Sequence, residues 1–149
     1  MSDRNYNIDR FYREHRLYYD TALREMKNGR KVNHWIWFIF PQLRFLGRSH
    51  NARFYGMEDK QEARLYYEDE YLGRCLREIT YALLECKYDD PVVVMGGNGS
   101  GHIDAKKLQS SMTLFYEATG DELFAYVLDK FYDGKKDEAT VSYLKNHDG

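Results

Sequence analysis

The sequence predicts a compact, all-α, single-domain protein of about seven or eight helices, with little or no sheet. Apolar residues recur at intervals of three and four along most of the chain, which is the spacing of one buried helix face. Only 2 prolines interrupt these segments. The length of 149 residues suits one domain, and a hydrophobic fraction of 43% supplies the apolar surface for one core. We therefore treat residues 1–149 as a single helical domain.

In the first half of the chain, the predicted helices are bounded by residues that start or stop a helix. Gly29 is a left-handed stop after the first helix. Asn33 is placed to cap a short helix in the apolar run HWIWFIFP, which should lie in the middle of the core. Ser49 begins a single turn within a loop. Asp59 opens the next helix, because a glutamate three residues later completes a capping box.

Glycines and aspartates divide the second half. Gly73 costs its helix up to ~1 kcal/mol relative to alanine, so we expect a close contact or a helix boundary there. For VVVM after Asp90, a short helix or an extended piece is favoured, because a lone strand has no partner. Asp104 is placed to cap the helix that follows the glycine-rich loop 96–101. The longer predicted helices cover about residues 8–28, 59–67, 70–86, 104–119, 121–132 and 138–145.

Composition and charge exclude several classes of protein. The net charge is −2, from 22 basic and 24 acidic residues, so generic nucleic-acid binding has little electrostatic support. No apolar run is long enough to cross a membrane. Cys75 and Cys86 lie too far apart in one predicted helix for a disulfide; as reduced thiols they favour a cytoplasmic protein, as does the highly charged start of the chain. No histidine or cysteine pair has the spacing of metal ligands, and we expect neither metal nor cofactor.

The first candidate site is the aromatic run with its two polar ends. Trp35 and Trp37 offer flat rings for stacking on a ligand, although a run of this density is usually core. His34 can act as an acid or a base near neutral pH. For His34 and Gln42, which bracket the run, a place in a cleft and a place in the core are equally compatible with the sequence.

A second candidate combines hydroxyl and basic side chains. Lys107 and Ser111 share a helix face, and Ser110 lies on its adjacent edge. Such a group can bind an anion or activate a nucleophile, and the alternative is hydrogen bonding between helices. Arg48 belongs to a group of basic side chains at residues 44–53, where an anion site and a solvated loop are the alternatives.

Loop 96–101 is a weaker candidate. Its glycines precede a helix N-terminus, where backbone amides can hold a phosphate. However, the sequence is not GxxxxGK[ST], and no strand–loop–helix unit surrounds it. A flexible loop is therefore the favoured interpretation.

Five motifs occur in a specific order between about Phe11 and Leu144. They are HWIWFIFPQLRFLGRS, YGMEDKQEARLYY, YLGRCLREI, KLQSSMTLF and DEATVSYL. In order and spacing they resemble the family called domain of unknown function 1810. The resemblance implies a compact, all-helical single domain and no established activity. The chain departs from the family at loop 96–101, where a shorter, Asp-rich connection is usual, and this weakens the phosphate-loop interpretation.

Two hypotheses about function follow. The leading one is a pocket for a small anionic ligand, with nucleotide-like molecules among the candidates, lined by His34, Trp37, Gln42, Arg48, Lys107, Ser110 and Ser111. In an enzymatic version His34 is the general acid–base, and Lys107 with Ser111 stabilises developing negative charge. Whether the protein is an enzyme stays open. The rival hypothesis is a non-enzymatic protein-interaction domain with a tyrosine-rich surface drawn from Tyr18, Tyr19, Tyr66 and Tyr67.

Overall fold

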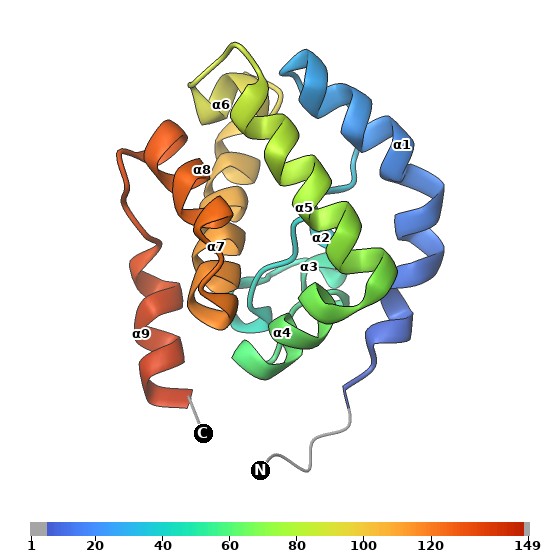
Figure 1. Cartoon of the computed structure of the whole chain (residues 1–149), viewed down its shortest axis with the longest axis vertical. Coiled ribbons are helices and arrows are strands. Elements are labelled where there is room, and N and C mark those ends of the chain that lie inside the picture. The colour runs from blue at the N-terminus through green and yellow to red at the C-terminus, as the bar shows by residue number, and fades with distance from the viewer. Residues whose placement is uncertain (1–5, 148–149) are drawn as a thin grey trace.

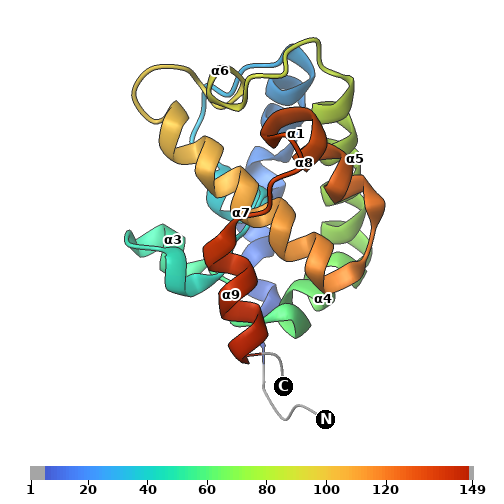
Figure 2. The same cartoon turned by 90° about the vertical axis from the view of Figure 1, so that its left-hand side faces the viewer.

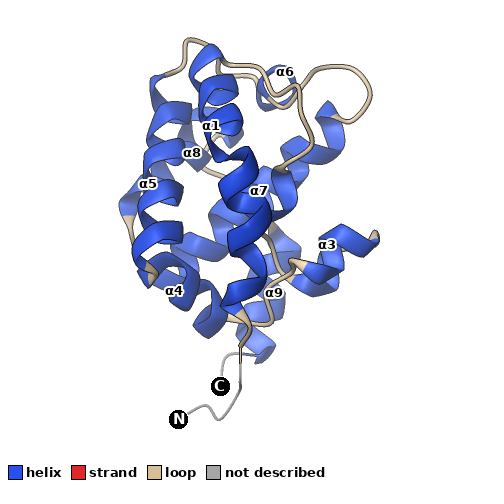
Figure 3. Cartoon of the chain, turned by 90° about the vertical axis from the view of Figure 1, so that its right-hand side faces the viewer, coloured by secondary structure: helices blue, strands red, loops and turns tan. Residues whose placement is uncertain are grey.

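The structure, a computed structural model, describes residues 6–147 and is an all-α single domain, as predicted. Within that range there are nine α-helices, six of them seven residues or longer (Figure 3). The only bridge of β type that the described residues contain joins Leu43 to Met57. The helices are α1 (Tyr12–Asn28), α2 (Ile36–Ile39), α3 (His50–Phe54), α4 (Lys60–Glu68), α5 (Glu70–Glu85), α6 (Pro91–Val94), α7 (Gly101–Thr119), α8 (Glu122–Tyr132) and α9 (Glu138–His147), with 3-10 turns η1 (Ile8–Phe11) and η2 (Arg44–Leu46).

Helix α7 is the central element. It packs against α4, α6, α8 and α9, while α1 packs along α5 on the opposite side of the molecule (Figure 1). Buried residues occur on α7 along nearly its whole length, as expected for a helix with neighbours on several sides. The short helix α2 contributes three buried side chains to the same core, as the all-apolar sequence around it predicts: Ile36, Phe38 and Ile39.

Several predicted helix ends are confirmed. Gly29 has the left-handed φ of 78° that ends α1. The Ser49 hydroxyl accepts a hydrogen bond from the Ala52 amide, 3.1 Å away, at the start of α3. The Asp59 carboxylate accepts one from the Glu62 amide at 3.0 Å, at the start of α4. The VVVM segment forms the short helix α6.

Two predicted caps are wrong, and in both cases the side chain has a tertiary partner. Helix α2 begins at Ile36, and Asn33 instead donates its side-chain amide to Glu25. Helix α7 begins at Gly101, so that Asp104 lies in its first turn, where it pairs with Lys31. A buried carboxylate that needs a partner outweighs the preference of aspartate for a cap position.

Glu25 holds the segment that leads into α2. Its buried carboxylate accepts hydrogen bonds from the backbone amides of Val32 (2.8 Å) and Asn33 (3.1 Å), from the Asn33 side chain (2.5 Å) and from the Trp35 indole (2.8 Å). Burial opposes its ionisation, but these hydrogen bonds outweigh burial and hold the pKa of Glu25 below its usual range. Glu25 therefore fixes the entry to the apolar run.

His15 makes the stability of the fold depend on pH. Its ring is buried between Tyr19 and Tyr71, and Nδ1 lies 2.9 Å from the Tyr71 hydroxyl. Burial lowers the pKa of His15 from 6.5 to about 4. The unfolded chain therefore binds this proton below pH ~6.5, whereas the folded chain stays neutral until pH ~4. Stability must fall as the pH drops through this window.

We expect the wild-type protein to lose ~2 kcal/mol of unfolding free energy between pH 6.5 and pH 5 through His15. The variant His15→Gln keeps a polar group for Tyr71 but cannot titrate. Urea unfolding at pH 7 and pH 5 should show a clearly smaller pH-dependent loss in the variant than in the wild type. Equal losses in the two proteins would contradict a neutral, buried His15.

Candidate functional site

A cavity of about 660 Å³ lies between α7, the segment 42–52 and the start of α9. Figure 2 views the side of the molecule on which these elements meet, with α3 projecting from the body beside α7 and α9. The walls combine apolar side chains with basic and amide groups. The residues that line the cavity are Gln42, Leu46, Gly47, Arg48, Ser49, Ala52, His102, Ile103, Lys106, Lys107, Ser110, Asp137 and Ala139.

This cavity contains four of the residues selected from the sequence: Gln42, Arg48, Lys107 and Ser110. Gln42 and Arg48 come from the chain that follows the aromatic run, and Lys107 and Ser110 come from the middle of α7. The β-bridge from Leu43 to Met57 holds the first segment in place.

The other selected residues lie outside the cavity lining. Trp37 lies beneath Lys107, whose Nζ is 5.7 Å from the centre of its ring. Ser111 is fully buried, and its hydroxyl has no hydrogen-bond partner among residues 6–147. His34 is exposed and is not among the lining residues. It belongs to the segment that Glu25 holds at the entry to α2.

A buried ion pair lies beside the cavity. Lys31 Nζ is 2.9 Å from Asp104 Oδ2, and both side chains are almost inaccessible to solvent. Lys107 Nζ is 3.9 Å from Asp104 Oδ1, which is longer than the distance from Lys31 Nζ to the same carboxylate. Because Lys31 already balances the charge of Asp104, the charge of Lys107 remains available to a ligand.

A second carboxylate, Asp137, lies in the wall of the cavity. Its Oδ1 is 2.8 Å from Lys106 Nζ, and its Oδ2 accepts hydrogen bonds from the backbone amide and the hydroxyl of Thr140. Burial opposes ionisation of Asp137, but these contacts outweigh it and hold the pKa of Asp137 below its usual range. The Asp137 amide donates to the Thr113 hydroxyl of α7 at 2.9 Å, which ties the start of α9 to α7.

Gln42 and Arg48, which both line the cavity, have polar groups without a protein partner among residues 6–147. Gln42 is 9% exposed, and its side-chain amide makes no hydrogen bond with any residue between 6 and 147. Arg48 is exposed and makes no ion pair within the same range. The amide atoms of Gln42 are not among the fully buried polar atoms without a partner, so they reach the cavity and offer two donors and an acceptor to whatever fills it.

Loop 96–101 turns the chain from α6 into α7 through glycines with positive φ: Gly96, Gly97 and Gly99. The first turn of α7 carries Asp104, the carboxylate partner of Lys31, so an acidic side chain lies close to the amides that a phosphate would use. This arrangement does not favour phosphate binding at the N-terminus of α7.

The tyrosines of the rival hypothesis are distributed between core and surface. Tyr19 and Tyr66 are buried, and each donates a hydrogen bond to a backbone carbonyl. Tyr18 is 36% exposed, and Tyr67 is half-buried with its hydroxyl donating to Asp121 at 2.6 Å. Two of the four side chains are therefore not available to a partner protein.

Sequence reasoning did not assign three charged residues to the pocket: Lys31, Lys106 and Asp137. Asp137 directly precedes the last predicted helix and has Thr140 three residues later, which is the pattern of an N-cap. That signal was present in the sequence. The pairing of Lys31 with Asp104 has no local signal, because the two residues are far apart in the sequence and meet only in the folded chain.

Two further findings concern the part of the chain that the structure describes. Between residues 6 and 147, no group of three or more histidine, cysteine, aspartate or glutamate side chains is arranged to hold a metal ion. In the same range, no helix combines the length and the apolar character that crossing a bilayer requires.

The fold and the cavity define an all-helical single-domain protein with a basic, amide-bearing pocket between its central helix and the segment after the aromatic run. The family model "Protein of unknown function (DUF1810)" matches residues 5–144, and the chain belongs to this family. A similar solved structure is the crystal structure of the conserved hypothetical protein Rv1873 from Mycobacterium tuberculosis, with 37% identity and a TM-score of 0.85. The match covers 92% of this chain and 95% of that one. No curated protein matches.

Proposed function

We propose that this protein binds a small anionic ligand in the cavity between α7 and residues 42–52. The observation that carries the proposal is the convergence of Arg48, Lys106 and Lys107 on one cavity that also presents the unpartnered amide of Gln42. A volume of about 660 Å³ is within the ~300–1,000 Å³ of typical small-molecule sites.

The balance of charge supports an anion. Asp104 and Asp137 each have a lysine partner within 3 Å, Lys31 and Lys106 respectively. The charges of Lys107 and Arg48 are therefore in excess around the cavity. An arginine and a lysine that line one cavity from different segments of the chain can bind an anion together, and each charged hydrogen bond contributes ~1.5–3 kcal/mol.

His34 has no role in this binding, because its side chain is not part of the cavity lining. Binding of the anion also does not require a chemical reaction. Ser111 and Trp37 take a supporting role, since they lie next to Lys107 on the core side, and Trp37 packs beneath the lysine ammonium.

The first test is a thermal-shift screen of the wild-type chain against phosphates, sugar phosphates, nucleotides and small carboxylates. For an anion that binds, we expect Lys107→Met to weaken affinity about tenfold or more, because the variant keeps the stem over Trp37 but loses the charge. Asp104 keeps its partner Lys31, so the fold should remain stable. Titration calorimetry measures the affinities.

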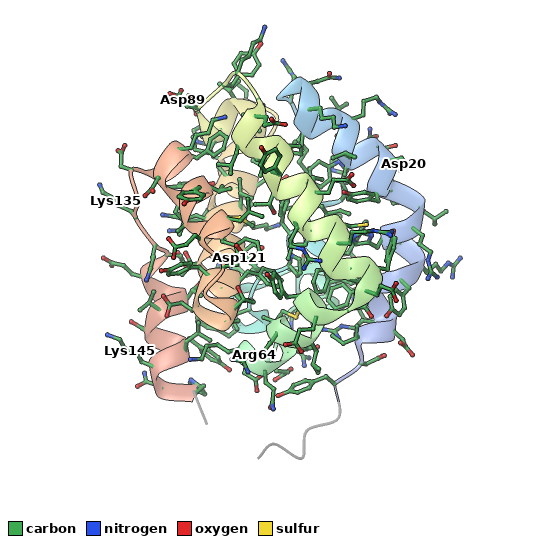
Figure 4. All side chains as sticks on the ribbon, in the orientation of Figure 1. Asp20, Arg64, Asp89, Asp121, Lys135 and Lys145 are labelled. Atoms are coloured by element: carbon green, nitrogen blue, oxygen red, sulfur yellow. The ribbon has the colours of Figure 1, made fainter. Side chains whose placement is uncertain are left out.

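The matched control is Lys145→Ala. Lys145 is an exposed lysine on α9 that does not line the cavity, and its side chain points away from the body of the protein (Figure 4). Its removal changes the net charge by the same amount and should leave affinity unchanged. Equal weakening by the two variants would mean that the anion responds to net charge alone, and the proposed site would then be wrong.

A further inference from the structure

The cavity has a gradient of polarity from its inner wall to its mouth. Two polar residues of the inner wall, Gln42 and Ser110, are 9% and 2% exposed and carry no charge. The cations at the mouth are exposed: Arg48 is open to solvent, and the Lys106 side chain is 66% exposed. Lys107 lies between these two levels at 22%.

The buried carboxylate of Asp137 strengthens this gradient. It lies in the cavity wall with almost no access to solvent, and it is ionised. An anion placed deep in the cavity would face this charge at close range. An anion at the mouth would meet this charge through Lys106, whose ammonium is 2.8 Å from Asp137 Oδ1 and has three donors that can serve Asp137 and a ligand together.

The inner wall of the cavity is complementary to a neutral hydrogen-bonding group. The free amide of Gln42 offers donors and an acceptor side by side, and a cyclic amide or amidine edge of a nucleobase complements this pattern. The Ser110 hydroxyl donates to the Lys106 carbonyl at 3.1 Å, so its oxygen is left as an acceptor. Between the two levels, Leu46 and Ile103 provide apolar walls for a ring.

From this gradient we infer that the ligand is a nucleoside monophosphate bound with its base inward. The base lies against Gln42 and Ser110, and the phosphate stays toward the mouth, where Arg48 and Lys107 supply the excess positive charge and Lys106 supplies a further donor. This inference rests on the proposed function and adds to it the class and the orientation of the ligand. A free phosphate would leave the amide of Gln42 unpartnered, and most of the cavity volume unfilled.

The test is to titrate the wild-type chain with four nucleoside 5′-monophosphates, the parent nucleosides, ribose 5-phosphate and inorganic phosphate. We expect at least one monophosphate to bind at least tenfold more tightly than its nucleoside. The same monophosphate should also bind at least tenfold more tightly than ribose 5-phosphate. These two ratios report the phosphate end and the base end separately.

Two variants assign the ends to residues. Arg48→Ala should reduce the affinity for the monophosphate about tenfold and leave the affinity for the nucleoside unchanged. Gln42→Leu should bring the affinity for the monophosphate down to that of ribose 5-phosphate. If leucine disturbs folding, Gln42→Asn is the second variant, because its shorter side chain keeps the amide but moves it away from the ligand. Circular dichroism and the melting temperature without ligand check that each variant is folded.

The outcomes separate the inference from the proposed function. If another anion binds and depends on Lys107, but all four monophosphates fail to bind, the inference is wrong and the proposed function stands. If a monophosphate binds but Gln42→Leu weakens it no more than it weakens ribose 5-phosphate, the orientation is wrong. If none of the anions binds at millimolar concentration, both are overturned.

Discussion

Replacing Gly73 with alanine is expected to lower the free energy of unfolding by at least ~3 kcal/mol, although the same change stabilises an unobstructed helix by up to ~1 kcal/mol. A Cβ on Gly73 would lie 1.8 Å from the carbonyl oxygen of Tyr67 and 2.7 Å from its carbonyl carbon. These atoms belong to the backbone at the end of α4, where the chain turns sharply into α5.

This contact cannot relax cheaply, because Tyr67 is fixed on both sides. Its hydroxyl donates to Asp121, and its ring packs against Phe124 at 6.0 Å between centres. Because the Tyr67 side chain is held by α8, the Tyr67 main chain cannot move away from Gly73 unless the contacts between α4 and α8 break. The sequence predicts a close contact or a helix boundary at Gly73, and this geometry shows a close contact near the start of α5.

Urea unfolding of Gly73→Ala measures the effect, and Gly97→Ala is the control. Gly97 has a positive φ of 76°, but its added Cβ would have nothing within 4 Å. The control therefore carries only the backbone strain, ~1–2 kcal/mol. If Gly73→Ala is no more destabilising than Gly97→Ala, the α4–α5 corner is softer than its contacts indicate.

Replacing Glu25 with alanine is expected to cost ~3–5 kcal/mol of unfolding free energy. The substitution leaves four groups without an acceptor: the backbone amides of Val32 and Asn33, the side-chain amide of Asn33, and the buried indole of Trp35. Glu25→Gln should be milder, because it keeps the volume and one acceptor oxygen. The glutamine amide nitrogen would, however, face the side-chain donor of Asn33, and two donors cannot hydrogen-bond to each other.

Because Glu25 is charged, its contribution to the free energy of unfolding also depends on pH. Since its pKa is lowered in the folded protein, the stabilisation is complete above the unfolded value, 4.5, and is lost as the pH falls through the folded value. Glu25→Gln should therefore lose less stability than the wild type on acidification below pH ~4.5.

The stability of both variants is measured by chemical unfolding at pH 7, with tryptophan fluorescence as the signal. Trp35 is a suitable reporter because its indole loses its acceptor in Glu25→Ala. The matched control is Asp20→Ala in the same helix. Asp20 is exposed and lies on the outer side of α1 (Figure 4), so its removal should change stability by less than ~0.5 kcal/mol. A loss below ~1 kcal/mol in Glu25→Ala would show that the segment 32–35 is held by packing alone.

The helical architecture was predictable because it depends on local patterns. The three- and four-residue spacing along α5 and α8 reflects burial of one face, and Gly29 and Ser49 act on their immediate neighbours. The errors lie where a distant side chain decides. Asn33 does not cap α2 because Glu25 takes its amides, and Asp104 does not cap α7 because Lys31 draws it inside.

The candidate site was predictable only in part, for a similar reason. Gln42, Lys107 and Ser110 were chosen because polar types interrupt apolar segments, and all three line the cavity. One helical step of about 100° moves Ser111 from that lining into the core, and periodicity alone cannot fix such a step. His34 precedes α2, and its direction is set by the hydrogen bonds of Glu25 rather than by a helix.

The contrast between the two lysine–carboxylate pairs has a consequence for ionic strength. Lys31 and Asp104 are closed off from solvent, so dissolved ions cannot weaken their attraction, whereas Lys106 and Arg48 are open to solvent and are screened over ~8–10 Å at physiological salt. Added salt should therefore lower the affinity of the pocket for a charged ligand. It should leave the ion pair between Lys31 and Asp104 of α7 intact. The ion pair that anchors α7 is thus insensitive to salt, whereas ligand binding at the mouth of the cavity depends on it.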